Sequence, residues 1–196
     1  MPDVLDLYQT SFPVNEQMRL SWWVHLLNEL SFPSPSAQPE RLLYAAVGDP
    51  AGEVIGFACC EVHRDAGIAY LIYIATREDL RGQGIGAIIY HQVIDELLSH
   101  KNTEIVLFEV EIPEAVAQTS SDALRLAQRR IAWYQRQGAR LLEGVRYTQT
   151  VGWQNPLEMQ LMLHSRTPVT PEQAFAAASR LFGNNIMVTG TLNLTP

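Results

Sequence analysis

Residues 70–86, YLIYIATREDLRGQGIG, decide the fold more than any other stretch of this sequence. They begin as a strand, pass through a short polar loop and reach Gly82, Gly84 and Gly86, which open a helix. The first N–H groups of a helix lack acceptors within it, the helix dipole adds partial positive charge, and glycines let a pyrophosphate approach closely. The stretch therefore predicts a phosphate-bearing cofactor. The alternative is that these glycines serve only a tight turn and close packing of the helix.

The elements on either side of this stretch are typical of an α/β protein. Three upstream strands with short joints predict antiparallel hairpins, and the helix between two strands predicts a parallel pair with a right-handed crossover. Asn15 is expected to cap an early helix that ends at Pro33. Its expected buried stripe is Met18, Trp22, Leu26 and Leu30. The expected strands are 42–47, 54–62, 68–75, 105–112, 139–143, 157–163 and 186–194, and the other helices are 84–99, 121–137 and 171–182.

Composition limits the classes of protein to which the chain can belong. Its 196 residues carry 14 Lys plus Arg against 21 Asp plus Glu, a net charge of −7, and 47% are hydrophobic. One domain is expected, and the absence of basic runs argues against nucleic acid or an anionic membrane as a partner. Cys59 and Cys60 lie on opposite faces of a strand and cannot easily pair. With no signal peptide or membrane span in the sequence, we expect a cytoplasmic protein.

Three phosphate-binding patterns compete for the glycines. The Walker A pattern fails, because the sequence has no Gly-Lys-Ser/Thr. The dinucleotide fingerprint fits Gly82, Gly84 and Ala87, with Glu109 near the place of the ribose acid, but a six-residue loop separates these glycines from their strand. The third pattern is Arg or Gln, two residues, Gly, one residue, then Gly or Ala, and it is met from Arg81 onward.

By this third pattern the sequence resembles the GNAT superfamily of acyl-CoA N-acyltransferases. Residues 133–139, WYQRQGA, strengthen the resemblance, because they are similar to the family's signature of an aromatic residue, Tyr, three residues, Gly and Phe. The resemblance implies a twisted mixed sheet flanked by helices, with a core over about 1–164 and an extension over 165–196. Ala139 replaces the usual Phe, and Ala127 stands where many members carry an Asn that touches the cofactor.

The resemblance also implies a site for acetyl-CoA and a catalytic acid. Main-chain groups of the strand before the loop pair with the pantetheine arm, and the loop amides cradle the pyrophosphate, aided by Arg81 or Arg77. Tyr134 takes the place of the general acid that hydrogen-bonds the departing CoA sulfur. The cofactor-binding residues implied are Ile74, Ala75, Thr76, Arg81, Gly82, Gln83, Gly84, Ile85 and Gly86.

A base is the remaining requirement, since an amine nucleophile must be unprotonated. Glu109 and Glu111 share one face of an expected strand near its carboxyl end, where ligands bind in parallel pairs, although each could also be a solvated carboxylate. Glu61 is a further candidate. The five dispersed histidines predict no metal site, and Cys59 has no His at motif spacing, which favours direct transfer over a covalent intermediate.

The function predicted is therefore transfer of an acetyl group from acetyl-CoA to a small-molecule or peptide amine in a ternary complex. A non-catalytic acyl-CoA-binding or sensing module and, less favoured, a NAD(P)-dependent oxidoreductase are the alternatives. The net charge is consistent with an acidic acceptor side that includes Glu109 and Glu111. The Trp22-Trp23 pair and residues 186–194 either cover a homodimer interface or close the core.

Overall fold

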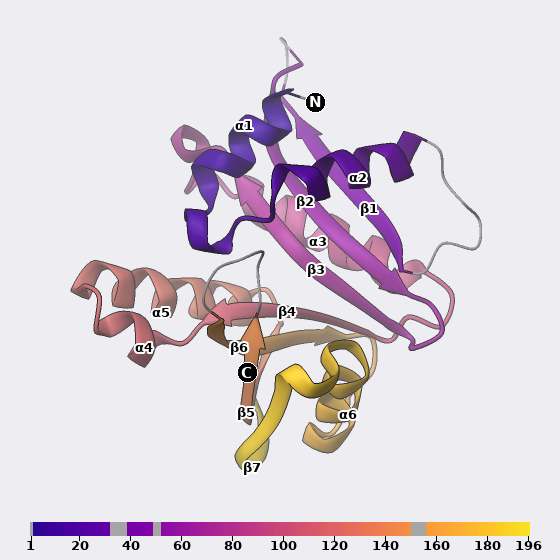
Figure 1. The fold of residues 1–196 in the computed structure, drawn as a ribbon, viewed down its shortest axis with the longest axis vertical. Helices are drawn as coiled ribbons and strands as arrows, with labels where there is room; N and C mark the ends of the chain where they lie inside the picture. Colours follow the sequence, from indigo (N-terminus) through magenta and orange to yellow (C-terminus); the bar gives the residue numbers. More distant parts are fainter. Residues whose placement is uncertain (1, 32–38, 49–51, 150–155) are drawn as a thin grey trace.

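The seven strands form one mixed sheet in the order β1-β2-β3-β4-β6-β5-β7, in a computed structural model that describes residues 2–31, 39–48, 52–149 and 156–196 (Figure 1). Five of the six neighbouring pairs are antiparallel, and β3 and β4 run parallel. This is not the doubly wound parallel sheet that a dinucleotide fingerprint requires. The strands are β1 Glu40–Val47, β2 Val54–His63, β3 Ile68–Thr76, β4 Ile105–Glu111, β5 Arg140–Gln149, β6 Leu157–Ser165 and β7 Ile186–Thr195.

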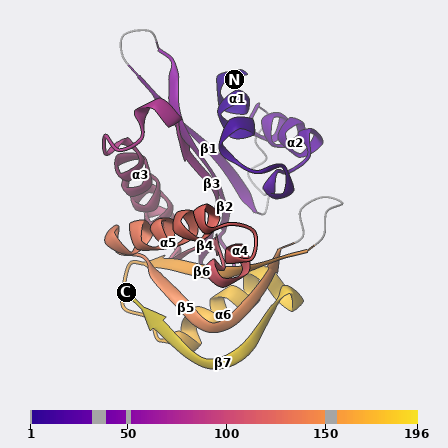
Figure 2. The same ribbon diagram turned by 90° about the vertical axis from the view of Figure 1, so that its left-hand side faces the viewer.

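Helices cover both faces of this sheet (Figure 2). On one face α3 and α5 enclose the largest apolar cluster. On the other face α1 and α2 cover β2 and β3, and α6 covers β4, β5 and β6, so that this face has two separate clusters. The helices are α1 Pro2–Ser11, α2 Leu20–Ser31, α3 Ile85–Ser99, α4 Pro113–Ala117, α5 Ser121–Arg136 and α6 Pro171–Phe182, with 3₁₀ turns η1 Val14–Glu16, η2 Glu78–Leu80 and η3 Gly183–Asn185.

The parallel strands β3 and β4 separate after a short contact. Beyond Tyr70, β3 stays paired with β2 as far as Thr76, and β4 stays paired with β6 as far as Glu111. In the described part of the chain β3 and β4 have no further pairing with each other, so each turns a backbone edge toward the opening between them. The three positions at which they pair are Ile68–Ile105, Ala69–Val106 and Tyr70–Leu107.

The expected α/β class, with helices flanking a mixed sheet, is confirmed, and most elements form close to their expected bounds. The helix expected from Asn15 is wrong, because Asn15 lies in η1 and α2 begins at Leu20. The Tyr73 hydroxyl accepts from the Met18 N–H (3.3 Å) and donates to the Glu16 carbonyl (2.9 Å), so these backbone groups bond to β3 instead of extending a helix. The helices α1 and α4 were not expected, and β5 ends six residues later than predicted.

The expected buried stripe of the early helix is also only partly right. Within α2, Leu26 is buried as predicted, but its partner in the core is Trp23, which is 1% exposed. Leu30 is exposed, and Met18 lies outside the helix. α2 ends at Ser31, and Pro33 lies outside the described residues.

Two further expectations concern the cysteines and the last strand. Cys59 and Cys60 are buried on opposite faces of β2, as predicted, and both are free thiols. The segment expected over 186–194 forms β7, which pairs with β5 and closes the cluster under α6 through Ile186 and Leu194. No helix among the described ranges has the length and apolarity needed to span a bilayer.

Candidate active site

The glycine-rich loop forms the turn that leads from η2 into α3. Gly82 (φ +81°) and Gly84 (φ +84°) adopt the left-handed conformation that favours glycine, and a Cβ at either position would meet nothing within 4 Å. Gly84 precedes α3 without a capping side chain, so the N–H groups of Ile85 and Gly86 stand at a helix start where the helix itself offers no acceptor. This open cradle of backbone donors fits an anionic group such as a pyrophosphate.

The same loop lies against the end of β3 and against α5. A Cβ on Gly86 would come within 3.2 Å of Thr76 Oγ1 and 3.7 Å of the Trp133 ring, so glycine is what allows α3 to start this close to both elements. β2 pairs with one edge of Ile74, Ala75 and Thr76, while their other edge faces the opening toward β4. An extended ligand could therefore add to β3 as a further strand does.

Arginine side chains flank the loop, but they are not equally available. Arg77 is held by Asp79 (2.8 Å) and Glu53 (2.7 Å), and the hydrogen bonds that it donates to these two carboxylates raise its pKa. Arg81 is more exposed and makes a long hydrogen bond to the Thr76 carbonyl (3.4 Å). A cavity of about 410 Å³ lies beside the loop, between α1 and the Arg77–Arg81 segment. Of the two arginines, Arg81 is the better placed to meet a phosphate.

Tyr134 lies in the last turn of α5 and packs into the core on the α3 side. Its ring centroid is 4.6 Å from that of Phe108 and 5.5 Å from that of Tyr90. Burial raises its pKa to about 12, with the Arg130 charge opposing and the Glu111 charge adding to the shift. The phenol is therefore protonated at neutral pH and can donate a hydrogen bond.

Glu109 and Glu111 point to the other face of the sheet, as their alternation predicts, just beyond the point where β3 and β4 separate. The Glu109 carboxylate accepts from Gln149 Nε2 on β5, and it also receives hydrogen bonds from the hydroxyls of Tyr70 and Tyr147. Burial raises the pKa of Glu109 to about 7, although these donors lower it. A carboxyl group with this pKa can take up a proton near neutral pH.

Two residues that sequence reasoning did not select complete this polar cluster. Arg130, one turn before Tyr134 on α5, forms an ion pair with Glu111 at the end of β4. Glu16, at the end of η1, is close enough to Glu109 and Glu111 for their charges to interact. Burial and the Glu111 charge raise the pKa of Glu16 to about 7, while Arg130 lowers it.

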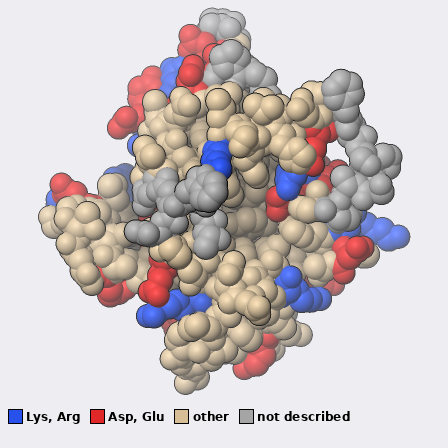
Figure 3. Space-filling view, viewed as in Figure 1, with Lys and Arg blue, Asp and Glu red and all other residues tan. Residues whose placement is uncertain are grey.

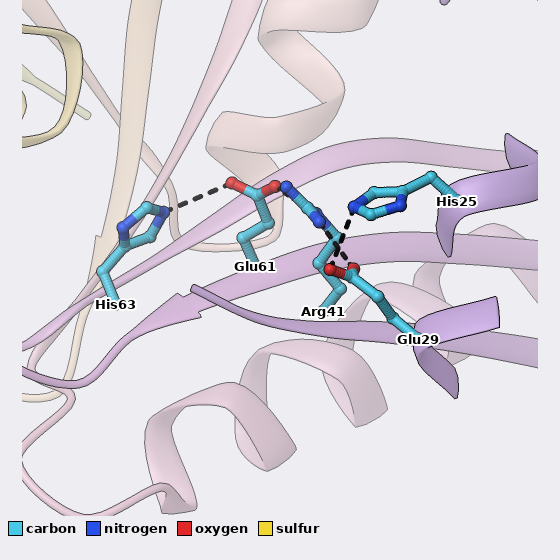
Figure 4. A network of polar contacts seen from close by, with 5 residues as sticks. All are labelled: His25, Glu29, Arg41, Glu61 and His63. Atoms are coloured by element: carbon cyan, nitrogen blue, oxygen red, sulfur yellow. Dashed lines mark hydrogen bonds and ion pairs between the residues drawn. The ribbon is translucent and has the colours of Figure 1, made fainter. Parts of the chain in front are cut away.

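Glu61, the further candidate base, does not belong to this cluster. Figure 4 shows it in a separate polar network between α2 and the first two strands. Arg41 bridges Glu61 (2.9 Å) and Glu29, and His63 lies 3.3 Å from Glu61. Although burial alone would raise the pKa of Glu61, the hydrogen bonds from His63 and Arg41 hold it below its usual value. Glu61 thus ties β2 to β1 and is a poor base.

Other groups that the sequence analysis considered lie away from the opening or are unreactive. Burial raises the pKa of Cys59 to about 12, so its thiol is not a nucleophile at neutral pH. Within the described ranges, no three His, Cys, Asp or Glu side chains gather as a metal site. A second cavity, of about 590 Å³, lies at the far end of α3 and contains none of the predicted site residues; its lining includes Asp95, His164 and Arg166.

The structure thus brings together most of the predicted site and adds to it. The glycine loop, the end of β3 and Trp133 of the Tyr134 signature meet on one side of the opening, and Glu109 and Glu111 lie on the other. Glu16, Arg130 and Gln149 were missed, because none of them belongs to a motif. The one available signal for Gln149 was the strand pattern after Gly138, but the predicted strand ended six residues too early.

Comparisons with known proteins agree with this arrangement. The sequence model of the acetyltransferase (GNAT) family matches residues 1–139. A search among curated protein sequences found no match. A solved structure from Bacteroides thetaiotaomicron, assigned to the GNAT acetyltransferases, is 23% identical and has a TM-score of 0.65, over 92% of this chain and 90% of that one.

Two further solved structures share the fold at lower identity. The ribosomal-protein-S18-alanine N-acetyltransferase of Escherichia coli is 18% identical, with a TM-score of 0.55 over 86% of this chain and 88% of that one. An aminoglycoside 6'-N-acetyltransferase complexed with coenzyme A is 15% identical, with a TM-score of 0.58 over 86% and 91%.

Proposed function

Because this chain belongs to the acetyltransferase (GNAT) family, we propose that it transfers an acetyl group from acetyl-CoA to an amine, directly and in a ternary complex. The separation of β3 from β4 is the observation that carries this proposal. It opens the sheet between the glycine loop, which offers backbone donors for phosphate, and the carboxylates of β4, which can receive a proton from an amine. The two neighbours named as N-acetyltransferases agree with nitrogen as the acceptor atom.

The residues of the loop and of β3 would hold acetyl-CoA, the co-substrate that supplies the thioester. The amides from Gly82 to Gly86 would bind the pyrophosphate, with Arg81 adding a charge-assisted hydrogen bond. The free edge of Ile74–Thr76 would bind the pantetheine arm by main-chain hydrogen bonds. Backbone donors at a helix start would let an acidic chain bind a polyanion without a basic patch; on the face in Figure 3, the Lys and Arg side chains are scattered.

Two side chains would move the protons. Glu109 would take a proton from the acceptor ammonium, directly or through water, which frees the nitrogen lone pair to attack the thioester carbonyl. As the C–S bond breaks, Tyr134 would donate to the sulfur. A thiol has an ordinary pKa of about 8.5, well below the pKa of about 12 of Tyr134, so hydrogen bonding to the thiolate precedes full proton transfer. Glu111, paired with Arg130, would fix the end of β4 beside Tyr134.

A non-catalytic acyl-CoA-binding module is the second candidate function. Ala127 and Ala139, the two departures from the family's pattern, favour it, because both are buried small residues where members carry larger side chains. This candidate predicts acetyl-CoA binding with no acetyl transfer to any amine.

Calorimetric titration and a transfer assay test the proposal. We expect saturable binding of acetyl-CoA, no binding of NADH, and acetylation of at least one amine in a broad panel read by mass spectrometry. Gln83→Glu places a negative charge in the exposed loop and should weaken acetyl-CoA binding about tenfold. Gln128→Glu, the same change on the exposed side of α5, should leave the affinity unchanged. If Gln83→Glu binds acetyl-CoA with wild-type affinity, the loop is not part of the cofactor site.

A further inference from the structure

The face of the sheet that carries α1, α2 and α6 has a polar junction where its two apolar clusters meet. Glu16 reaches this junction from the N-terminal side, Glu109 and Glu111 from β4, and Gln149 from β5. Figure 3 shows this face hollowed between the N-terminal helices and the C-terminal part. The junction lies on the side of the sheet opposite α3 and Tyr134, so a ligand there would approach the opening between β3 and β4 from the face away from the glycine loop.

The buried polar atoms that remain unpaired at the junction are all hydrogen-bond acceptors. Gln149 is 9% exposed; its Nε2 donates to Glu109, but its Oε1 has no partner among the described residues. Oε2 of Glu111 is likewise buried without a partner in that part of the chain. The amide orientation of Gln149 is fixed, because the reverse would turn its oxygen toward a carboxylate. Acceptors without donors call for a ligand rich in N–H groups.

The charges at the junction call for a cation. Among the described residues at the junction, three carboxyl groups face one guanidinium, that of Arg130, which already pairs with Glu111. At Glu16, the Glu111 charge outweighs that of Arg130, and at Glu109 the Glu16 charge adds to the effect of burial. The local potential is therefore negative at both carboxyl groups, which favours either a proton or a bound ammonium group.

We propose that Glu16, Glu109, Glu111 and Gln149 form an acceptor subsite for an aliphatic diamine, one end of which is acetylated while the other stays charged. This inference rests on the function proposed above. The reacting ammonium gives its proton to Glu109; its nitrogen then forms the C–N bond as the C–S bond breaks, and the thiolate is stabilised and protonated by Tyr134. Once Glu109 is neutral, Glu16 and Glu111 still outnumber Arg130 by one negative charge. A second ammonium group on the acceptor balances that charge and donates to Glu16 and to Gln149 Oε1.

Titration calorimetry with three small probes tests this subsite. Protein saturated with CoA is titrated with 1,4-diaminobutane, n-butylamine and 4-aminobutanoate at pH 7. We expect the diamine to bind at least tenfold more tightly than butylamine, and the amino acid more weakly than either. Because Glu16 and Glu109 are partly protonated at pH 7, diamine binding should also release protons, measured as a dependence of the heat on the ionisation enthalpy of the buffer. A purely structural role for these carboxyl groups would give no such release.

Matched variants test whether the preference for the diamine depends on Glu16 and Gln149. Glu16→Gln should weaken diamine binding at least tenfold and butylamine binding less than threefold, and Gln149→Leu should likewise weaken diamine binding more than butylamine binding. Glu104→Gln, the same loss of charge at the exposed opposite end of β4, should change neither. Equal affinity for the diamine and butylamine, or a wild-type profile in Glu16→Gln, overturns the subsite. Acetyl-CoA titrations of the same preparations test the proposed function separately, since they do not depend on the acceptor.

Discussion

The two sides of the opening between β3 and β4 are built in different ways. The proposed cofactor side uses short continuous segments: the end of β3, the loop from Arg81 to Gly86 and the signature around Tyr134, all within the 1–139 match. The proposed acceptor side gathers single residues from η1, β4 and β5, and Phe182 of α6 packs behind them. Gln149 and Phe182 lie beyond the family match.

The difference follows from what each side is proposed to bind. A phosphate group is held by backbone donors, and backbone geometry needs specific residues at adjacent positions, so the cofactor side is visible as a motif. A cationic acceptor is held by side-chain carboxylates, which any strand or turn facing the right way can supply. The acceptor side therefore leaves no local pattern, and the variants below separate the two sides by which ligand each affects.

The largest effect is expected at the cofactor side from Tyr134→Phe. Loss of the hydroxyl removes the hydrogen bond to the leaving thiolate, so kcat should fall roughly 10²- to 10³-fold. The affinity for acetyl-CoA should change less than twofold, because the ring still packs on Phe108. Steady-state kinetics and calorimetry measure both quantities.

Tyr90→Phe is the matched control for Tyr134→Phe. Tyr90 is a buried neighbour whose hydroxyl has no partner in the described part of the chain, so its removal should leave kcat within twofold. An unchanged kcat in Tyr134→Phe would show that the Tyr134 hydroxyl takes no part in catalysis.

The next effect is expected at the acceptor side from Glu109→Gln, and it depends on pH. The folded-state pKa of Glu109 is about 7, above its ordinary value of 4.5, so the folded protein binds more protons than the unfolded chain between these values. The carboxyl group therefore contributes stability below pH 4.5 that is lost as the pH rises through 7. In urea denaturation Glu109→Gln should gain stability relative to the wild type between pH 5 and 8, by at most about 3 kcal/mol.

Although Glu109→Gln should gain stability, it should lose catalytic activity. If Glu109 takes the proton from the acceptor, wild-type kcat/KM rises with pH through about 7, and Glu109→Gln is slow and lacks this limb. Glu104→Gln serves as the control, because its side chain is exposed. A wild-type pH profile in Glu109→Gln would assign the proton to another carboxyl group of the junction.

A smaller effect is expected from Gly84→Ala in the loop. A residue with a Cβ at φ +84° is strained by about 1–2 kcal/mol, and relaxation of the loop should weaken acetyl-CoA binding about tenfold. Gly183→Ala introduces a Cβ at another positive φ (+56°), after α6, with open space around it. It should cost comparable thermal stability but leave acetyl-CoA binding unchanged. Equal affinity losses in the two variants would show that the loop acts only through stability.

The sequence predicted more of the proposed cofactor side than of the proposed acceptor side, for physical reasons. Periodicity located the strands and α3, and the glycines predicted the helix start that the structure shows after Gly84. Glu109 and Glu111 could be placed on one face by alternation alone. Glu16 could not be found, because its position depends on the Tyr73 hydroxyl, which holds η1 to β3 across 57 residues of sequence. A contact of that kind exists only once the sheet has formed.

The smallest effect is expected from Phe182→Leu, at the residue of the acceptor side that lies farthest along the chain. The Phe182 ring packs at 4.2 Å from Tyr147 and 5.4 Å from Tyr70, the two tyrosines whose hydroxyls bond to Glu109. With a smaller side chain these rings can shift, so KM for the acceptor should rise a fewfold and the pH midpoint of kcat/KM should move upward as hydrogen bonds to Glu109 lengthen. The free energy of unfolding should fall by about 1 kcal/mol, and acetyl-CoA binding should not change.

Phe175→Leu is the matched control for Phe182→Leu, because Phe175 packs on the same cluster from the middle of α6. This variant should lose stability without a change in KM or in the pH midpoint. If both variants behave alike, α6 supports only the core; a change in KM and pH midpoint confined to Phe182→Leu would make the segment after the family match part of the acceptor side.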